Sequence, residues 1–401
     1  MRSSSQPQPQ QPGRNWFVLG REKDLSAAEI AAVLSIKDNQ YSIEENQPIF
    51  YYSGTLPMTE DNLIKKLGGT IKIAKEIGSG LNRSELIKII QNILREKTGK
   101  ICFGLSSFSS LDTNELTRLG KEIKNNLKND GFSIRFVPNK EKVLSAATID
   151  HNNLIKKGGE FLICEQVGEK YSLAQTVALQ PYAEFSMRDY DRPGRDDVSG
   201  MLPPKLAMMM INLSEPQTND LILDPFCGSG TILTEAMIMG YQNLFGSDIS
   251  AKAISDTKIN IEWIKKHLNI TCPEFPLYNL DVKNLEEKTK PKSVDKIIAE
   301  PYMGKPLTGR ESYEEILAQS QELKTLYLES FKIFKKILKS GGVVVFIFPH
   351  YRKGNDVITT SLSKEIEGLG FTLYPFSKQK HLLYERPGQR VGREIWRFKK
   401  N

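Results

Sequence analysis

The sequence has no apolar run that approaches the roughly 18 residues needed to span a membrane. Cysteine and histidine are scarce: the four cysteines (Cys102, Cys164, Cys227 and Cys272) lie far apart, and the four histidines fall in no metal-ligand spacing. These absences argue against a structural zinc site and favour a reducing, cytoplasmic setting. Residues 1–14 lack the apolar core of a secretion signal, so we expect a disordered polar tail there.

The composition indicates a globular protein of more than one domain. Hydrophobic residues make up 39% and charged residues 26% of the 401 residues, as in a soluble globular chain. This length exceeds the usual size of one hydrophobic core, so two or three domains are expected. The net charge of +7 gives a mild preference for polyanions, but charge alone cannot identify one.

The N-terminal half divides into two patterned segments. Residues 15–80 combine short strands with a helix and are predicted to form a small α+β unit, whereas residues 81–170 follow an α-β-α-β-α-β pattern. The second helix of the latter segment has a basic outer face, which fits an RNA phosphate backbone or, equally, a solvated lysine face. This face carries Arg118, Lys121, Lys124 and Lys128.

A connector separates this half from a segment with a different period. Residues 181–205 are rich in proline, glycine and balanced charge, which is typical of a domain boundary. Beyond them, short apolar runs alternate with helical stretches. That alternation predicts an α/β domain with a mainly parallel, doubly wound sheet.

The stretch "LILDPFCGSGTILTEAMIMG" carries the strongest signal. A buried strand runs to Asp224, a turn with Gly228 and Gly230 lets a ligand approach the backbone, and a helix opens at Thr231 with free N–H groups for a carboxylate or phosphate. The pattern is neither the GxGxxG dinucleotide motif nor a P-loop. A strand-to-helix turn in some other nucleotide-binding sheet is the alternative.

Two later acids favour an adenosine-bearing ligand at this turn. Asp248 ends the second strand 24 residues after Asp224, where a carboxylate can hold both ribose hydroxyls. Asp281 ends the third strand and could accept from an adenine amino group, or it could instead cap the loop. The loop has no phosphate-binding lysine or arginine, so the predicted cofactor is S-adenosylmethionine, with Phe226 and Ile249 also in its site. No metal is expected.

These motifs resemble a known family. "DPFCGSGT", the acid after the second strand, "NLD" and an acid-Pro-aromatic turn are similar to class I methyltransferases that act on amino nitrogens. In the N-terminal half, "FVLGREKDLSAAEI", "SIRFVPNKEKVLSAATIDHNNLIKKGGEFLI" and "RDYDRPGRDDVSGMLPPKLAMMMINL" resemble the ferredoxin-like domain, the THUMP domain and the linker of the tRNA guanosine-10 N2-methyltransferase family. The resemblance covers nearly the whole chain from about residue 15.

The resemblance implies an architecture and a substrate. It predicts a ferredoxin-like domain at 15–80, a THUMP RNA-binding domain at 81–180, a linker at 181–200 and a Rossmann-like class I methyltransferase domain at 201–401. Its implied partner is tRNA, and it leaves open whether a small activating protein subunit is needed. The expected RNA contacts are Arg118, Lys121, Arg135, Lys140, Lys142, Arg192, Arg195 and Arg393, the last of which could equally be an ordinary surface arginine.

The catalytic turn departs from the family pattern. The family has Asp-Pro-Pro-Tyr, whereas this chain reads Ala299, Glu300, Pro301, Tyr302. Either Glu300 replaces the aspartate in a shortened turn, or Ala299 takes its position and the acceptor is lost. We favour the first, because the strand "KIIA" would deliver Glu300 to the crevice at the carboxyl ends of the strands. Tyr302 then stacks the target base, or it packs under the loop.

The resulting hypothesis is a tRNA methyltransferase that acts on the N2 amino group of a guanosine. The resemblance to the family implies that this guanosine is at position 10. Two alternatives remain open. The altered turn favours a catalytically inactive THUMP-type RNA-binding scaffold or complex subunit, and acid-Pro-Tyr turns also serve enzymes that methylate adenine in RNA.

Overall fold

The computed structural model describes residues 13–36, 41–43, 47–166, 168, 170–195, 200–354, 356–377, 379–386 and 388–401. The predicted tail therefore lies outside the described residues except for its last two. Contacts divide the chain into two compact units. Among the described helices, none combines the length and the apolar character needed to cross a membrane. Unit 1 comprises Met1–Gly20, Ile36–Lys65 and Thr70–Tyr182, and unit 2 comprises Arg21–Ser35, Lys66–Gly69 and Ala183–Asn401.

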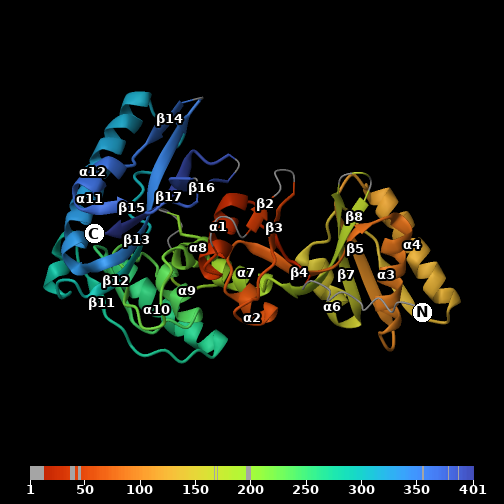
Figure 1. The fold of residues 1–401 in the computed structure, drawn as a ribbon. Coiled ribbons are helices and arrows are strands. Elements are labelled where there is room, and N and C mark those ends of the chain that lie inside the picture. The colour runs from red at the N-terminus through yellow and green to blue at the C-terminus, as the bar shows by residue number, and fades with distance from the viewer. Residues whose placement is uncertain are drawn as a thin grey trace, which may run out of the picture. The chain divides into compact units, whose positions relative to one another are not determined.

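Unit 1 contains an eight-stranded sheet in the order β2-β3-β1-β4-β8-β7-β5-β6 (Figure 1). The predicted boundary at residue 80 falls inside β4, which pairs with β1 on one side and β8 on the other. One sheet thus spans both predicted N-terminal domains, whose assignment as ferredoxin-like and THUMP stays a prediction. The strands are β1 (Asn15–Leu19), β2 (Tyr41–Ile43), β3 (Ile49–Tyr52), β4 (Thr70–Leu81), β5 (Ile101–Phe108), β6 (Ile134–Val137), β7 (Gly158–Gln166) and β8 (Lys170–Leu179).

Local sequence determines the two long helices of unit 1. α3 (Arg83–Arg95) and α4 (Thr113–Asn129) each begin at a capping box, formed by Asn82 with Glu85 and by Asp112 with Glu115. Their apolar residues recur at helical spacing and are buried with residues of β5 and β7, so both helices cover the same face of the sheet. The shorter helices are α2 (Glu60–Lys65), α5 (Ala146–His151) and α6 (Leu154–Lys157).

Unit 2 is built on a nine-stranded sheet whose main path is β11-β10-β9-β12-β13-β17-β15. The strands from β11 to β13 are parallel, and β17 is antiparallel to β13. This confirms the predicted mostly parallel, Rossmann-like sheet. The strands are β9 (Ile222–Asp224), β10 (Leu244–Asp248), β11 (Leu277–Asn279), β12 (Val294–Ala299), β13 (Leu338–Lys353), β14 (Asp356–Thr359), β15 (Phe371–Leu373), β16 (His381–Tyr384) and β17 (Val391–Lys400).

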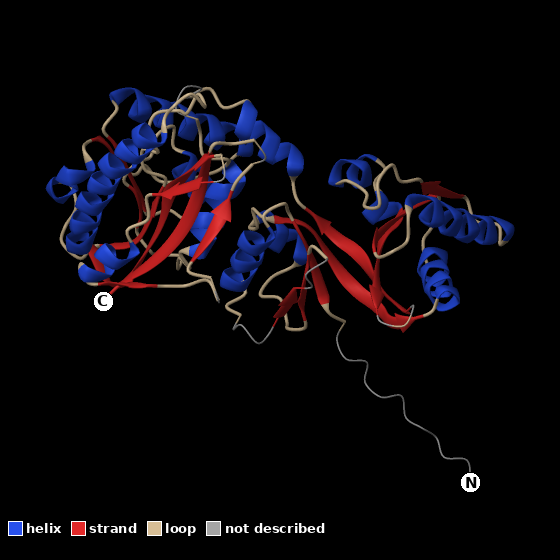
Figure 2. Cartoon of the chain, turned by 90° about the horizontal axis from the view of Figure 1, so that it is seen from above, coloured by secondary structure: helices blue, strands red, loops and turns tan. Residues whose placement is uncertain are grey.

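Helices cover both faces of this sheet, as the blue helices around the red strands of unit 2 in Figure 2 show. Alternate residues of the strands face opposite sides. Ile222 and Ile298 pack with the first set of helices, whereas Leu223 and Ile297 pack with the second. The first set is α8 (Pro204–Leu213), α9 (Thr231–Ile238) and α10 (Ala251–Leu268); the second is η1 (Val282–Glu287), α11 (Tyr313–Ile337) and α12 (Ser363–Gly368).

Part of the predicted linker is a helix. α7 (Tyr182–Tyr190) lies within residues 181–200, and its Arg188 is buried against Glu235 of α9, with 2.8 Å between Arg188 Nε and Glu235 Oε1. Residues 196–199 lie outside the described residues. The described residues of this segment from Ala183 onward therefore group with unit 2, whereas Tyr182 groups with unit 1.

Helix α1 (Lys23–Val33) groups with unit 2, although its sequence position is N-terminal. Its Glu29 is fully buried and accepts hydrogen bonds from Gly68 N and Gly69 N, both at 2.8 Å, and from Asn212 Nδ2 at 2.7 Å. Burial raises the pKa of Glu29 to about 7. This carboxylate therefore connects three segments that are far apart in the chain.

The buried carboxyl group predicts a pH dependence of stability. Because the pKa of Glu29 is higher in the folded state, that state binds more protons, and the free energy of unfolding should fall as pH rises from about 4.5 to about 7. Glu29→Gln should remove up to about 3 kcal/mol of this fall. Urea unfolding at several pH values measures this change in the free energy of unfolding. The control is Glu262→Gln, which replaces an exposed glutamate of α10. An unchanged slope in Glu29→Gln would contradict the assignment.

Candidate functional site

Three carboxylates meet where the strand order reverses. Asp224 ends β9, Asp248 ends the neighbouring β10, and Glu300 directly follows β12 on the other side of β9. The carboxyl ends of parallel strands share one sheet edge, and this reversal is where open α/β sheets bind ligands. Asp224 is only 1% exposed. Burial, and then the nearby charges of Asp248 and Glu300, raise its pKa well above the ordinary value.

The loop between β9 and α9 requires both of its glycines. Gly228 and Gly230 have φ of +52° and +83°, in the left-handed region that glycine tolerates. A Cβ on Gly230 would lie 2.8 Å from Thr257 Cγ2, whereas a Cβ on Gly228 would point into open space. Gly228 N donates to Asp248 Oδ2 at 2.9 Å, so the acid of β10 fixes the loop. The backbone at Gly228 is consequently accessible to a ligand.

The remaining predicted cofactor residues lie in the turns after β9, β10 and β11. Ile249 is 73% exposed, so its side chain is accessible to a flat ring. Asp281 Oδ1 accepts from Lys283 N at 2.9 Å and caps η1, so the loop-capping alternative holds for that oxygen. Phe226 N donates to Asp224 Oδ1 at 3.1 Å.

These groups fit an adenosine-bearing ligand. Each oxygen of a carboxylate has two lone pairs, so Asp248, whose oxygens each accept one backbone N–H, keeps capacity for two ribose hydroxyls. Asp281 Oδ2 and the exposed Ile249 could contact an adenine ring. Within the described residues, no group of three or more His, Cys, Asp or Glu is arranged to hold a metal ion.

Glu300 is paired with Arg393, which sequence reasoning had assigned to RNA or to the general surface. Arg393 Nε donates to Glu300 Oε1 at 2.5 Å, and both side chains are only 14% exposed. The strand register explains the pair. Ala299 of β12 is paired with Phe346 of β13, which is paired in turn with Trp396 of β17. Strand alternation then places Glu300 and Arg393 on the same face. No local spacing signals this contact across 93 residues.

Two buried tyrosines shape the turn after Glu300. Tyr327 donates to the carbonyl of Tyr302, and Tyr351 donates to the carbonyl of Met303, both at 2.7 Å. Burial raises the pKa of Tyr351 to about 12, so it remains a donor at physiological pH. Among the described residues none donates to the carbonyl of Pro301. Tyr302 is 53% exposed, which does not agree with packing under the loop.

The predicted RNA contact at Arg192 needs correction. Arg192 is 5% exposed, and its Nη1 donates to Thr231 Oγ1 at 2.5 Å, so it lies beneath the start of α9 and is not displayed to a phosphate backbone. Arg195 is half-buried and donates to the carbonyl of Tyr190. The sequence could not separate these two arginines, because both lie in the same proline- and glycine-bearing turn.

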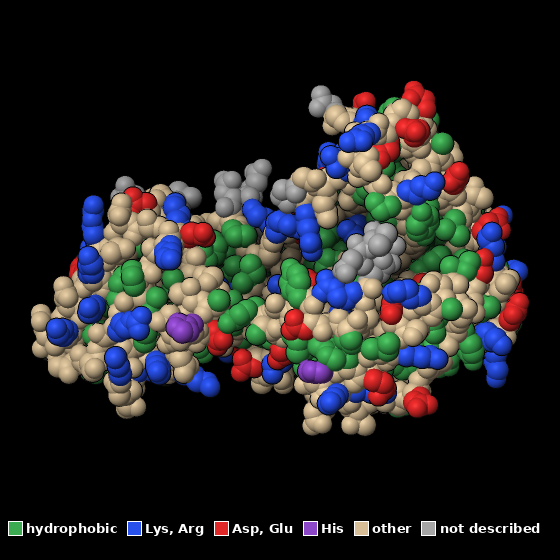
Figure 3. Space-filling view, turned by 180° about the vertical axis from the view of Figure 1, so that it is seen from behind, with side chains coloured by type: hydrophobic (Ala, Val, Ile, Leu, Met, Phe, Trp, Pro, Cys, Tyr) green, Lys and Arg blue, Asp and Glu red, His purple; other side chains and the backbone are tan. Residues whose placement is uncertain are grey.

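The predicted RNA contacts of unit 1 are all exposed: Arg118, Lys121, Arg135, Lys140 and Lys142. They come from α4, from the edge strand β6 and from the loop that follows β6. Over unit 1, on the face drawn in Figure 3, lysine and arginine side chains are more prominent than acidic ones. A basic surface of this kind suits a phosphate backbone.

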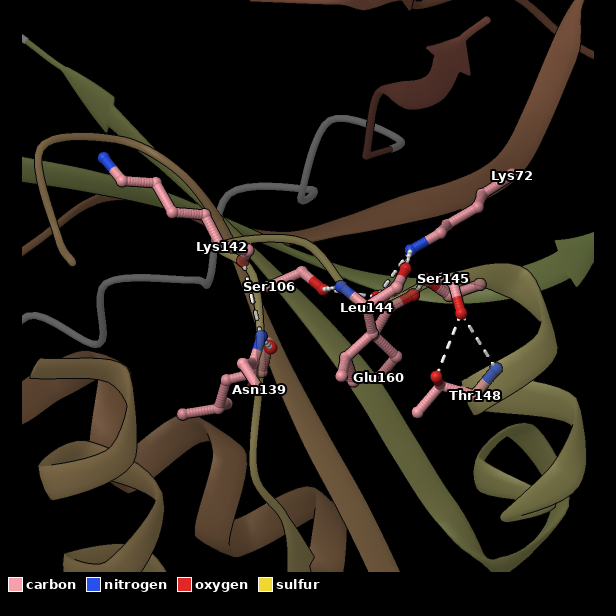
Figure 4. Close-up of polar contacts among 10 residues, drawn as sticks. Lys72, Ser106, Asn139, Lys142, Leu144, Ser145, Thr148 and Glu160 are labelled. Atoms are coloured by element: carbon pink, nitrogen blue, oxygen red, sulfur yellow. Dashed lines mark hydrogen bonds and ion pairs between the residues drawn. The ribbon is translucent and has the colours of Figure 1, made fainter. Parts of the chain in front are cut away.

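A buried ion pair holds the loop that carries Lys140 and Lys142. Lys72 Nζ lies 2.6 Å from Glu160 Oε1 and donates to the carbonyl of Leu144 at 2.7 Å. Ser106 donates to the same Glu160 oxygen at 2.5 Å and accepts from Leu144 N at 2.9 Å. Figure 4 shows these side chains converging beside the loop. The basic loop is therefore fixed to the sheet by buried charge.

Comparisons with known proteins assign a fold and a family. The RMKL-like methyltransferase domain profile matches residues 192–369. The crystal structure of TrmN from Thermus thermophilus superposes with a TM-score of 0.55 at 14% identity, over 97% of this chain and 99% of that chain. At that identity the likeness shows the fold alone, which the two chains share over nearly their whole lengths.

Curated relatives give the family itself. A tRNA (guanine(10)-N2)-dimethyltransferase of Methanothermobacter thermautotrophicus is 32% identical over 187 residues, 46% of this chain and 49% of the relative, so the match spans about half the relative's length. A probable tRNA (guanine(10)-N2)-dimethyltransferase of Methanothermococcus thermolithotrophicus is 32% identical over 145 residues, 35% of this chain and 78% of the relative. Together with the carboxylates at the sheet edge, these matches show that the chain belongs to the tRNA (guanine(10)-N2)-dimethyltransferase family.

Proposed function

We propose that the chain methylates the N2 amino group of a guanosine in tRNA, with S-adenosylmethionine as the methyl donor. The observation that carries the proposal is the position of Glu300, which follows β12 at the strand reversal next to Asp224 and Asp248. A hydrogen-bond acceptor is thereby placed beside a site suited to an adenosine-bearing cofactor. The match to curated relatives named for this reaction gives further support.

In this proposal the cofactor is held by residues at three strand ends. Asp248 binds the ribose hydroxyls, Asp281 accepts from the adenine amino group, and Ile249 contacts the adenine ring. When bound, S-adenosylmethionine supplies a methyl group already activated on a positively charged sulfur. The protein's contribution is then mainly to orient the acceptor amine, which is a proximity effect.

The target amine needs two acceptors and a stacking surface. The lone pair of an exocyclic amine is delocalised into the base, which makes the amine a poor nucleophile. Hydrogen bonds from its N–H groups to acceptors on the protein orient the nitrogen toward the methyl group. Glu300 and the free carbonyl of Pro301 are those acceptors, and the exposed Tyr302 stacks the extruded base. The Arg393 bond fixes the glutamate, which is one methylene longer than the family's aspartate.

Unit 1 supplies the proposed tRNA-binding surface. Its exposed cations on α4, on β6 and in the following loop can neutralise phosphates without reading a base sequence. The choice between guanosine in tRNA and adenine in another nucleic acid then depends on which RNA this surface recruits. The proposed substrate also makes the cytoplasm the expected location.

The proposal is tested by incubating the purified chain with S-adenosylmethionine and an unmodified tRNA transcript, then identifying methylated nucleosides by mass spectrometry. N2-methylguanosine or N2,N2-dimethylguanosine is expected. A transcript with inosine at position 10, which lacks only the 2-amino group, should lose that product. If the product is retained with inosine at position 10, the methylated guanosine lies at another position of the tRNA. N6-methyladenosine or no product would contradict the proposal.

A further inference from the structure

A buried cation lies at the start of α9 with much of its hydrogen-bonding capacity unused. Arg192 is 5% exposed and bonds Thr231 Oγ1 only through Nη1. Its Nε and Nη2 atoms are buried, and no described residue accepts from them. Nε and Nη2 form one edge of the guanidinium, with two parallel N–H groups that match the two oxygens of a carboxylate. The free edge is therefore the bidentate one.

No described carboxylate is bonded to Arg192. Asp189 and Glu235 are near enough for their charges to act on it, but Glu235 already pairs with Arg188 at 2.8 Å, and neither acid forms a described ion pair with Arg192. Burial lowers the pKa of Arg192, and the N-terminus of α9 adds the positive end of a helix dipole. A buried cation at that position is costly unless an anion joins it.

The geometry points to a specific anion, and we propose that Arg192 binds the carboxylate of the amino acid part of S-adenosylmethionine. The assignment rests on the proposed function for the identity of the cofactor. Thr231, which contacts Arg192, directly follows the glycine loop, and the loop is bonded to Asp248, the proposed ribose ligand. The carboxylate and the ribose thus have partners on the same loop.

A nucleotide or RNA phosphate suits this position less well than a carboxylate. Arg192 is only 5% exposed, so an extended phosphate backbone cannot lie along it, whereas the terminal carboxylate of a small ligand has to reach only one edge of the guanidinium. Asp224 and Asp248 at the same loop would repel a doubly charged phosphate group. A carboxylate that carries a neighbouring ammonium group is electrically compatible with them.

The test compares two ligands that differ only in the carboxylate. S-adenosylhomocysteine has it, and its decarboxylated analogue, 5′-deoxy-5′-(3-aminopropylthio)adenosine, does not. Isothermal titration should show that Arg192→Met weakens S-adenosylhomocysteine by about 30-fold and the analogue by less than about threefold. Arg192→Lys keeps the charge without the bidentate edge and should give an intermediate loss. Arg195→Met, a nearby arginine, is the matched control and should change neither affinity.

Three other outcomes would contradict the assignment of Arg192 or of the cofactor. Equal weakening of both ligands by Arg192→Met would show a structural effect on α9 and overturn the assignment, as would unchanged affinity for S-adenosylhomocysteine. Thermal unfolding of the variants checks that the fold is kept, and Arg192→Lys supplies the comparison if the methionine variant unfolds. Failure of the unmodified chain to bind either ligand would overturn the proposed cofactor, and with it this inference.

Discussion

Glu300→Ala is expected to lower the rate constant of methyl transfer by at least about 100-fold, because the target amine loses the acceptor that orients its nitrogen. The affinity for S-adenosylhomocysteine should stay within about threefold, since Glu300 lies on the opposite side of β9 from Asp248. Single-turnover kinetics with saturating tRNA measure the first quantity, and isothermal titration measures the second.

Two further substitutions distinguish the role of the Glu300 carboxylate from that of Arg393, which holds it. Glu300→Gln keeps one acceptor oxygen and should retain more activity than the alanine variant. Arg393→Met leaves the carboxylate but removes the 2.5 Å bond that holds it, so kcat should fall by about tenfold with a smaller change in KM. Full activity in Glu300→Ala would show that the shortened turn works through another acceptor, or that Ala299 occupies the family's acid position.

Lys72→Met is expected to destabilise unit 1 by about 3–5 kcal/mol, because it leaves the Glu160 carboxylate buried without its cation. Lys72 and Glu160 are 1% and 0% exposed, so water cannot replace the lost partner. Hydrogen exchange at the amides of β7 and β8 measures the loss within unit 1. Weaker tRNA binding should accompany it, since Lys72 also holds the carbonyl of Leu144 beside the basic loop.

Two variants provide the comparison. Lys75→Met is on the same strand but removes a partly exposed pair with Glu60, and it should cost less than about 1 kcal/mol. The double variant Lys72→Met with Glu160→Leu removes both charges and should recover part of the stability. If Lys72→Met were no more destabilising than Lys75→Met, the buried pair would not be a main support of the unit.

The sequence was most informative where function depends on short-range order. Asp224 and Asp248 end strands of a parallel sheet and Asp281 follows a third. Such strands end at one edge, so the shared location of the three acids could be predicted without coordinates. The role of the glycines at 228 and 230 could be predicted equally well, because the left-handed backbone that they adopt is a local requirement. The mostly parallel sheet followed from the alternation of strands and helices.

Only the tertiary structure decided which distant residues complete these elements. The pairing of Arg393 with Glu300, the support of the turn by Tyr327 and Tyr351, and the burial of Arg192 all depend on contacts between segments far apart in the chain. The same is true of α1, which groups with unit 2, and of the single sheet that crosses the predicted boundary at residue 80. Strand and helix periodicity indicate which face of an element is buried, whereas the neighbour that buries it depends on sheet order and register. For that reason the sequence located the acids of the site, and the fold supplied the cations that accompany them.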